Sequence, residues 1–258
     1  MKKPVIKNAW FRFYEELNDF LPPGKKHINF PYSFSGNQSV KDAIEAIGVP
    51  HVEIDMILVN GNPVDFSYKI RNEDKISVYP VFESLDITGV THLREKPLRD
   101  PKFILDVHLG KTARYLRLCG FDSLYEKDYD DNEIINISVS QKRIILTRDR
   151  GLLKNKKVTH GYWIRSQHPE SQFLEVIERL DLKNMIKPFT GCMGCNSVLE
   201  YVPKSEIEEK LLPGTRKYFD NFLLCPGCGQ IYWEGSHFEK MKVFIEKLTG
   251  NQNYTKNN

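Results

Sequence analysis

Four of the five cysteines in this chain of 258 residues stand in two pairs, and each pair has two residues between its members. The pairs are Cys192 with Cys195 and Cys225 with Cys228. Two intervening residues let one tight turn present both sulfurs to a single ion, and four thiolates complete the tetrahedral shell of a structural zinc site. We therefore expect zinc here, with the glycines of the two turns supplying positive backbone angles. Free thiols or a redox pair are the alternative interpretations.

The second group of chemistry-bearing residues is acidic and lies at the ends of short apolar runs. Asp106 ends the run at 103–105, and Asp149 follows the run at 143–147. Ligands of parallel sheets bind at the carboxyl ends of the strands, so these two carboxylates could meet at one metal ion. Mg²⁺ or Mn²⁺ would suit them, because hard divalent cations take oxygen ligands. Such an ion can activate a water and stabilise the charge that grows on a phosphate during hydrolysis.

An acidic cluster at 126–133 offers a third carboxylate. Asp130 and Glu133 have a local explanation, because they suit the N-cap and the capping-box partner of a helix expected at 133–140. We choose Asp131 as the third metal ligand, with Asp130 as the substitute candidate.

Basic residues accompany these acids. The helix expected at 109–119 has an apolar stripe made of Leu109, Ala113, Leu116 and Cys119. Arg117 and two other basic residues lie off this stripe, and the segment 142–157 holds seven Lys/Arg and a single acid. Cations near an acidic site suit a phosphodiester substrate, although a solvated charged face is the alternative. We expect phosphate contacts from Lys111, Arg114, Arg148 and Arg150.

The elements that must position these residues alternate between strand and helix. Continuous apolar runs at 103–105, 143–147 and 162–164, with helical patterns between the first two, predict a parallel sheet covered on both faces. Cys119 lies inside a helical apolar pattern, so we interpret it as a core residue rather than a nucleophile.

The pattern over 5–85 predicts a separate α+β unit. It contains a helix at 40–47 and strands at 5–14, 27–32, 54–59, 64–68 and 75–82. Ser39 is the expected N-cap of the helix, and Gly48 ends it. The dipeptide Asn60-Gly61 predicts a tight turn between two strands.

The order of these elements resembles the ubiquitin-like β-grasp of small sulfur-carrier proteins. The resemblance is carried by residues 57–64, ILVNGNPV, and residues 74–80, DKISVYP. Those carriers end in an exposed Gly-Gly, whereas this strand continues into residues 81–84. We therefore expect a binding or packing role, with a protein partner, rather than carrier chemistry.

Residues 106–122, DVHLGKTARYLRLCGFD, and residues 143–153, RIILTRDRGLL, resemble a PIN-like ribonuclease family. The family is named after the C-terminal domain of the mutator-seven exonuclease, and its resemblance to this chain extends from about 101 to 243, zinc ribbon included. It implies an RNA-cleaving domain that uses Asp106, Asp131 and Asp149 with Mg²⁺ or Mn²⁺. PIN domains generally use a further acid, and Asp122 stays open as that acid or as a turn residue. Bacterial and archaeal members often carry the same ubiquitin-like domain in front.

Together these features predict an α/β, PIN-like parallel-sheet nuclease domain with a C-terminal zinc ribbon, preceded by an α+β β-grasp domain. The expected boundaries are 1–85 for the β-grasp domain, 86–100 for a linker, 101–185 for the nuclease domain, 186–249 for the zinc ribbon and C-terminal helix, and 250–258 for a flexible tail.

Composition agrees with an intracellular protein that has a packed core. The net charge is +3 and the apolar fraction is 40%. The chain has no apolar run long enough to span a membrane, and no apolar signal core follows residues 1–4, so we expect a cytoplasmic location. A non-catalytic RNA- or ribosome-binding zinc-ribbon module is the alternative function, and a sulfur-carrier-like partner protein is a third. The RNA substrate, the endo- or exonuclease mode and the oligomeric state stay open.

Overall fold

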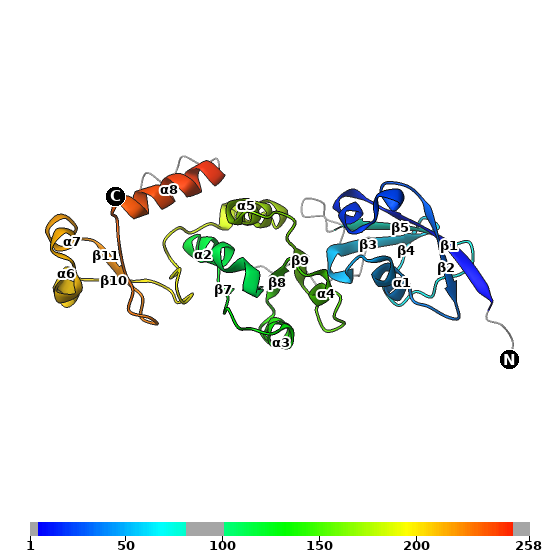
Figure 1. The fold of residues 1–258 in the computed structure, drawn as a ribbon, viewed down its shortest axis with the longest axis horizontal. Coiled ribbons are helices and arrows are strands. Elements are labelled where there is room, and N and C mark those ends of the chain that lie inside the picture. The colour runs from blue at the N-terminus through cyan, green and yellow to red at the C-terminus, as the bar shows by residue number, and fades with distance from the viewer. Residues whose placement is uncertain (1–4, 81–100, 250–258) are drawn as a thin grey trace. The chain divides into compact units, whose positions relative to one another are not determined.

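The computed structural model describes residues 5–80 and 101–249, whose helices and strands are labelled in Figure 1. The described residues fall into two compact units. Among the described residues, one unit groups 5–80 and Pro101 with Asp130–Trp163, and the other groups Lys102–Tyr129 with 164–249. The expected linker, the expected tail and the last two residues of the strand expected at 75–82 lie outside the described residues. The expected domain boundaries stay predictions.

The N-terminal part of the first unit is a five-stranded sheet with the order β2-β1-β5-β3-β4. The strands are β1 (Ile6–Phe13), β2 (Phe30–Ser35), β3 (Ile54–Val59), β4 (Asn62–Pro63) and β5 (Lys75–Pro80). β1 and β5 pair in parallel at the centre, and the other neighbours are antiparallel. This mixed sheet, with one main helix between β2 and β3, confirms the β-grasp prediction.

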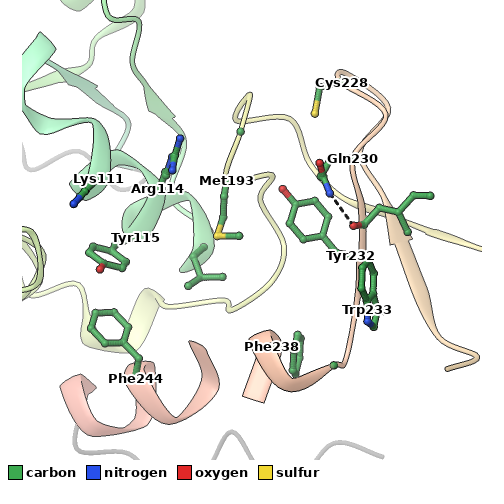
Figure 2. Close-up of a pocket in the computed structure, with 14 residues that line it drawn as sticks. Lys111, Arg114, Tyr115, Met193, Cys228, Gln230, Tyr232, Trp233, Phe238 and Phe244 are labelled. Atoms are coloured by element: carbon green, nitrogen blue, oxygen red, sulfur yellow. Dashed lines mark hydrogen bonds between the residues drawn. The ribbon is translucent and has the colours of Figure 1, made fainter. Parts of the chain in front are cut away.

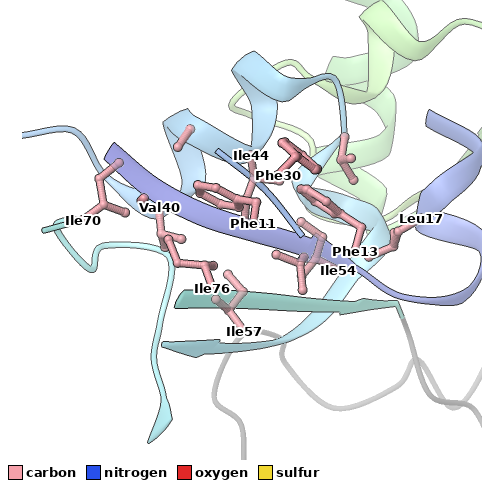
Figure 3. Close-up of a cluster of buried hydrophobic side chains, with 14 of the residues drawn as sticks. Phe11, Phe13, Leu17, Phe30, Val40, Ile44, Ile54, Ile57, Ile70 and Ile76 are labelled. Carbon is pink, nitrogen blue, oxygen red and sulfur yellow. The ribbon is translucent and has the colours of Figure 1, made fainter. Parts of the chain in front are cut away.

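The helix α1 (Val40–Ile47) begins and ends as its sequence predicts. The Ser39 hydroxyl accepts a hydrogen bond from the Asp42 backbone N–H at 3.1 Å, and Gly48 ends the helix with φ +127°. Its apolar side packs on the alternate residues of β1, and Phe11 and Ile44 are fully buried in the resulting core (Figure 3). Every second residue of the strand and every third or fourth residue of the helix therefore lie in one shared core.

The strand expected at 64–68 is wrong. β4 stops at Pro63, and the Asp65 carboxylate then accepts hydrogen bonds from the backbone N–H and the hydroxyl of Ser67, at 2.8 and 2.6 Å. This Asx turn bends the backbone away from the ladder. Phe66 and Tyr68 still pack against the core, so the alternation in the sequence reports burial rather than strand pairing.

The same unit contains a second group of elements: α3 (Asp131–Gln141), β8 (Ile144–Thr147), α4 (Arg150–Leu153) and β9 (Gly161–Trp163). β8 and β9 pair in parallel, as expected for these apolar runs. The Trp163 backbone N–H donates to the Glu53 carboxylate at 2.6 Å, and His51 Nε2 lies 2.9 Å from the Val158 carbonyl oxygen. The 3-10 helix His51–Glu53 of the β-grasp domain therefore contacts this second group directly.

The second unit begins with β6 (Phe103–Leu105), α2 (Gly110–Leu118) and β7 (Ser123–Leu124). β6 and β7 pair in parallel. The predicted stripe of α2 is confirmed, since Leu109, Ala113, Leu116 and Cys119 are all 0–1% exposed. α2 contacts α5 (Pro169–Arg179), and the Thr112 hydroxyl donates to the Gln172 side chain at 2.5 Å.

The C-terminal part of this unit is a three-stranded antiparallel sheet with the order β10-β11-β12. Its elements are β10 (Glu200–Val202), α6 (Lys204–Ile207), α7 (Pro213–Tyr218), β11 (Phe222–Leu224), β12 (Ile231–Trp233) and α8 (Ser236–Thr249). A small core of Val202, Ile207, Leu211 and Phe222 holds the sheet and α6 together. Further 3-10 helices are Glu15–Phe20, Pro23–Lys25, Val107–Leu109, Lys183–Met185 and Glu208–Lys210.

The parallel strand pairs, the β-grasp sheet and the C-terminal cysteine cluster confirm the predicted mixed α/β fold class. No helix within the described residues combines the length and the apolar character needed to cross a membrane.

Candidate functional site

The four paired cysteines come together in the second unit. Their sulfur atoms all lie within 4.8 Å of one another, with 3.6 Å between Cys192 and Cys228 and 3.3 Å between Cys195 and Cys225. A tetrahedral zinc ion with Zn–S bonds of about 2.3 Å would separate its sulfurs by about 3.8 Å. The arrangement of the four sulfurs therefore fits a metal ion such as zinc, and soft thiolate ligands favour zinc over hard cations.

The two cysteine turns have the same backbone design. In the first, the Asn196 N–H donates to the Cys192 carbonyl oxygen at 2.9 Å, and in the second the Gly229 N–H donates to the Cys225 carbonyl oxygen at 2.9 Å. Asn196 has φ +71° and Gly229 has φ +74°. The residue directly after the second cysteine of each turn therefore takes the left-handed conformation that Asn and Gly tolerate.

The expected positive φ is confirmed for Gly229, but the expectation is wrong for Gly194 and Gly227, the glycines inside the two pairs. Gly227 is required for a different reason: a β-carbon there would collide with the Ser197 hydroxyl and press on the Cys195 sulfur at 3.2 Å. The close approach of the two cysteine turns to each other, rather than backbone conformation, excludes a side chain at this position.

Two hydroxyl groups lie next to sulfur atoms of the cysteine cluster. The hydrogen bond with Ser197 lowers the pKa of the Cys195 thiol to about 6, which favours the thiolate that binds metals. The Tyr232 hydroxyl lies 3.2 Å from the Cys192 sulfur, and burial raises the pKa of this phenol. Such hydrogen-bonding groups around a metal site orient its ligands. The fifth cysteine, Cys119, is a core residue as predicted, and burial raises its pKa to about 12.

Arg117 is not a solvent-facing cation of α2, contrary to the sequence expectation. Its side chain is buried, and its guanidinium donates to the carbonyl oxygens of Ser123 at 2.7 Å, Gly194 at 2.8 Å and Met193 at 3.3 Å. Because α2 is covered by the first cysteine turn on this side, a position off the apolar stripe is still buried. Arg117 thus fixes the turn to the helix, a role that no spacing in the sequence indicates.

A second clamp joins the first cysteine turn to β7. The Asn196 side chain accepts a hydrogen bond from the Ser123 N–H at 2.7 Å and donates to the Asp122 carboxylate at 2.6 Å. Lys102 lies 3.9 Å from the other oxygen of Asp122. Asp122, which the sequence left open as a further acid, is therefore engaged in holding the cysteine turn.

Asp106 and Asp149 occupy equivalent local positions. Each directly follows or lies just beyond a buried strand, and each carboxylate caps a helix by accepting the backbone N–H two residues later: His108 at 2.8 Å and Gly151 at 2.7 Å. Asp106 is 6% exposed, whereas Asp149 is exposed. Within the described residues, the second oxygen of Asp149 has no hydrogen-bond partner.

The acids at 130–133 agree in part with the helix-capping roles that the sequence predicts. Asp130 is the N-cap of α3, and the Asp130–Glu133 capping box is confirmed by hydrogen bonds of 2.9 and 2.8 Å. Asp131 is the first residue of α3 and is exposed. Across the described residues, the close groups of three or more potential metal ligands consist of the four cysteines alone. The joint role of Asp106, Asp131 and Asp149 stays a prediction.

The four predicted phosphate contacts differ in their surroundings. Lys111 and Arg114 are exposed on α2. Arg148 is exposed, and its carbonyl oxygen accepts from the Trp163 indole N–H at 3.1 Å. Arg150 is half-buried, and its guanidinium lies over the rings of Trp163 and Phe20.

Comparisons with known proteins agree with this arrangement. The chain matches the family model described as the Mut7-C RNAse domain over residues 101–245 and the model described as Mut7-C ubiquitin over residues 6–86. No curated protein and no solved structure matches it. The first match covers more than half of the chain and includes both cysteine turns. This chain therefore belongs to the Mut7-C RNAse domain family and carries the Mut7-C ubiquitin domain in front.

Proposed function

We propose that this protein is a metal-dependent ribonuclease that hydrolyses RNA phosphodiester bonds. The observation that carries the proposal is the match to the Mut7-C RNAse domain family over residues 101–245, which spans all of the predicted catalytic acids. The sequence resemblance implies that these acids share one site.

Asp106, Asp131 and Asp149 would hold Mg²⁺ or Mn²⁺, which take oxygen ligands and usually retain waters. When bound, such a cation lowers the pKa of a coordinated water and neutralises charge on the scissile phosphate. The local geometry supports Asp149 in this role, since one of its oxygens orients the side chain by capping α4 and the other is available. Asp106 has the same capping device at the end of β6.

Basic side chains would position the RNA backbone. Lys111 and Arg114 are exposed cations that can approach phosphates without first breaking a buried contact, and Arg148 is exposed as well. Arg150 belongs to the same predicted set, but its guanidinium already contacts two aromatic rings. We propose that it orients the loop that carries Asp149 in addition to any contact with RNA.

The four cysteines would hold structural zinc, because four thiolates leave no open coordination position for a substrate. Arg117 joins the first cysteine turn to α2, the helix that also carries Arg114 and Lys111. Zinc would therefore act by ordering an RNA-binding surface rather than by chemistry.

The second candidate function is RNA or ribosome binding without cleavage. One observation favours it: the metal-binding group that gathers within the described residues is a closed thiolate set rather than a carboxylate set. We further propose a cytoplasmic location, because a reducing compartment keeps four such thiols available for metal. The β-grasp domain would supply a surface for a protein partner.

Titration of the zinc-loaded full chain with Mn²⁺ separates these functions independently of activity. The nuclease proposal predicts Mn²⁺ binding that weakens at least about tenfold in Asp149→Asn, with zinc content unchanged. Asp128→Asn, an exposed acid of the same cluster region, is the matched control and should bind Mn²⁺ normally. Mn²⁺ binding that is absent, or that is equal in all three proteins, would favour the non-catalytic binding module.

A further inference from the structure

A cavity of about 830 Å³ lies in the second unit between α2, the cysteine turns, β12 and α8 (Figure 2). Its volume falls within the range of about 300–1,000 Å³ that is typical of ligand sites. The cysteine cluster borders the cavity through Cys228, and four thiolates around a metal ion would leave it no open coordination position. The cavity is therefore a separate feature that the metal turns help to shape.

The walls of the cavity are mostly aromatic and apolar. β12 contributes Tyr232 and Trp233, α8 contributes Phe238 and Phe244, and α2 contributes Tyr115. Tyr115 and Phe244 pack against each other with 4.8 Å between ring centroids, so they form one fixed wall. In Figure 2 the rings of Tyr232 and Trp233 stand on the opposite side, with Met193 between the two groups.

Two cations border this aromatic lining. Lys111 and Arg114 lie one helical turn apart on α2, and both line the cavity. In the described part of the chain, neither side chain forms an ion pair or a hydrogen bond. The combination of unpaired cations with half-buried aromatic faces is complementary to an unpaired nucleobase joined to its phosphates.

We propose that this cavity binds an unpaired base of single-stranded RNA. The base stacks on the aromatic lining, and Lys111 and Arg114 contact the adjacent phosphates. A base inside a duplex cannot enter, because its faces are covered by its neighbours. The inference rests on the proposed action on RNA and adds its substrate class: RNA that is single-stranded where it meets the zinc ribbon.

The rigidity of the cavity supports this use. Arg117 holds the Gly194 carbonyl at 2.8 Å, and Tyr232 lies 3.2 Å from the Cys192 sulfur, so α2 and β12 are both tied to the metal turns. Phe238 stacks on Phe189 with 3.8 Å between centroids, which fixes the start of α8. A preformed aromatic site loses little side-chain entropy on binding.

The test measures binding of short fluorescent RNA to the zinc-loaded full chain carrying Asp149→Asn, without added Mg²⁺ or Mn²⁺. Three probes of equal length are compared: a single-stranded oligonucleotide, the same strand with abasic nucleotides, and a duplex. We expect the abasic strand and the duplex to bind about tenfold or more weakly than the intact strand, because stacking is lost. Equal binding of the intact and abasic strands would overturn the proposal.

Two substitutions localise the effect. Lys111→Glu with Arg114→Glu should weaken binding of the intact strand roughly tenfold. The double variant should also reduce the slope of log affinity against log salt by about 1.4, which is the share of two single-strand phosphate contacts. The matched control, Lys183→Glu with Lys210→Glu, makes the same charge change at exposed positions outside the cavity and should bind normally. Equal losses of RNA affinity in both double variants would show that net charge alone explains the effect, and would overturn the proposed site.

Trp233 provides a direct readout. The intact strand should quench its fluorescence, and Trp233→Phe, which keeps an aromatic ring in the ribbon core, should remove the quenching component. If a second copy of the chain occupies the cavity instead, sedimentation will show concentration-dependent dimers and Trp233 will not respond to RNA. If the chain prefers the intact single strand in this way but the unsubstituted chain does not cleave RNA, the nuclease proposal alone is contradicted. If the unsubstituted chain cleaves RNA but shows no such preference, the base site alone is contradicted.

Discussion

The Arg150 guanidinium carbon lies 4.0 Å from the centroid of the Trp163 ring. The same carbon is 5.2 Å from the centroid of Phe20, and the guanidinium donates to the carbonyl oxygens of Phe20 and Asp19 at 3.4 Å. Phe20 and Trp163 themselves pack with 4.8 Å between centroids. The residue next to the proposed catalytic Asp149 therefore joins the β-grasp domain to β9.

Replacing Arg150 with alanine should lower the stability of the first unit. Cation–π contacts with two rings and two weak hydrogen bonds are lost, which together amount to about 2 kcal/mol. The apparent Tm in calorimetry should fall by about 5 °C. The Tm of Arg150→Lys should fall nearly as far, since an ammonium cannot stack as a planar guanidinium does. An unchanged Tm with weaker RNA binding in the alanine variant alone would instead assign Arg150 to phosphate contact.

Arg117→Met should loosen the first cysteine turn. The substitution leaves the carbonyl oxygens of Ser123 and Gly194 without a buried donor, at a cost of about 1–3 kcal/mol for each group. Because the turn carries two metal ligands, zinc affinity measured by competition with a chelator should fall about tenfold. A variant that keeps both its Tm and its zinc affinity would contradict this positioning role.

Gly191→Ala tests the same contact from the other side. A β-carbon at Gly191 would lie 2.5 Å from the Arg117 carbonyl oxygen, a backbone atom that cannot move aside cheaply. We expect a loss of about 1–3 kcal/mol in the free energy of unfolding, measured by denaturant titration. Gly214→Ala is the matched control in the same unit, since its β-carbon meets nothing within 4 Å. Equal stabilities would show that the turn does not pack on α2 this closely.

Metal analysis of the purified chain should find one zinc ion. Cys225→Ser should lose it and expose the small ribbon core, because removing one ligand opens the tetrahedral shell. Cys119→Ala should keep the ion, since this buried thiol is outside the cluster. Full zinc occupancy in Cys225→Ser would contradict a four-thiolate site.

The sequence predicts the fold well where local signals and burial agree. The bounds of α1, β3 and β6 match their patterns residue for residue, because a cap, a tight turn or a continuous apolar run defines each of them. The strand expected at 64–68 failed where these signals conflict. Alternating apolar residues meet the core there, but the Asp65 turn takes the backbone out of the ladder.

The site is less predictable, because its supporting residues depend on tertiary contacts. The four cysteines follow from their spacing alone. Arg117 and Asn196 carry no comparable signal, since their roles require knowing which surface of α2 and β7 the first cysteine turn covers. One weak signal was present: Asn196 and Gly229 occupy the same place in their turns, and both residue types tolerate positive φ.

Cleavage of labelled single-stranded and structured RNAs tests most directly whether this protein is a metal-dependent ribonuclease. The zinc-loaded chain is incubated with Mn²⁺, Mg²⁺ or EDTA, beside Asp106→Asn, Asp149→Asn and the control Asp128→Asn. We expect products that require Mn²⁺ or Mg²⁺, vanish in the first two variants and persist in the control. Products that survive EDTA or both substitutions, or no products from any RNA with a folded and zinc-loaded chain, would contradict it.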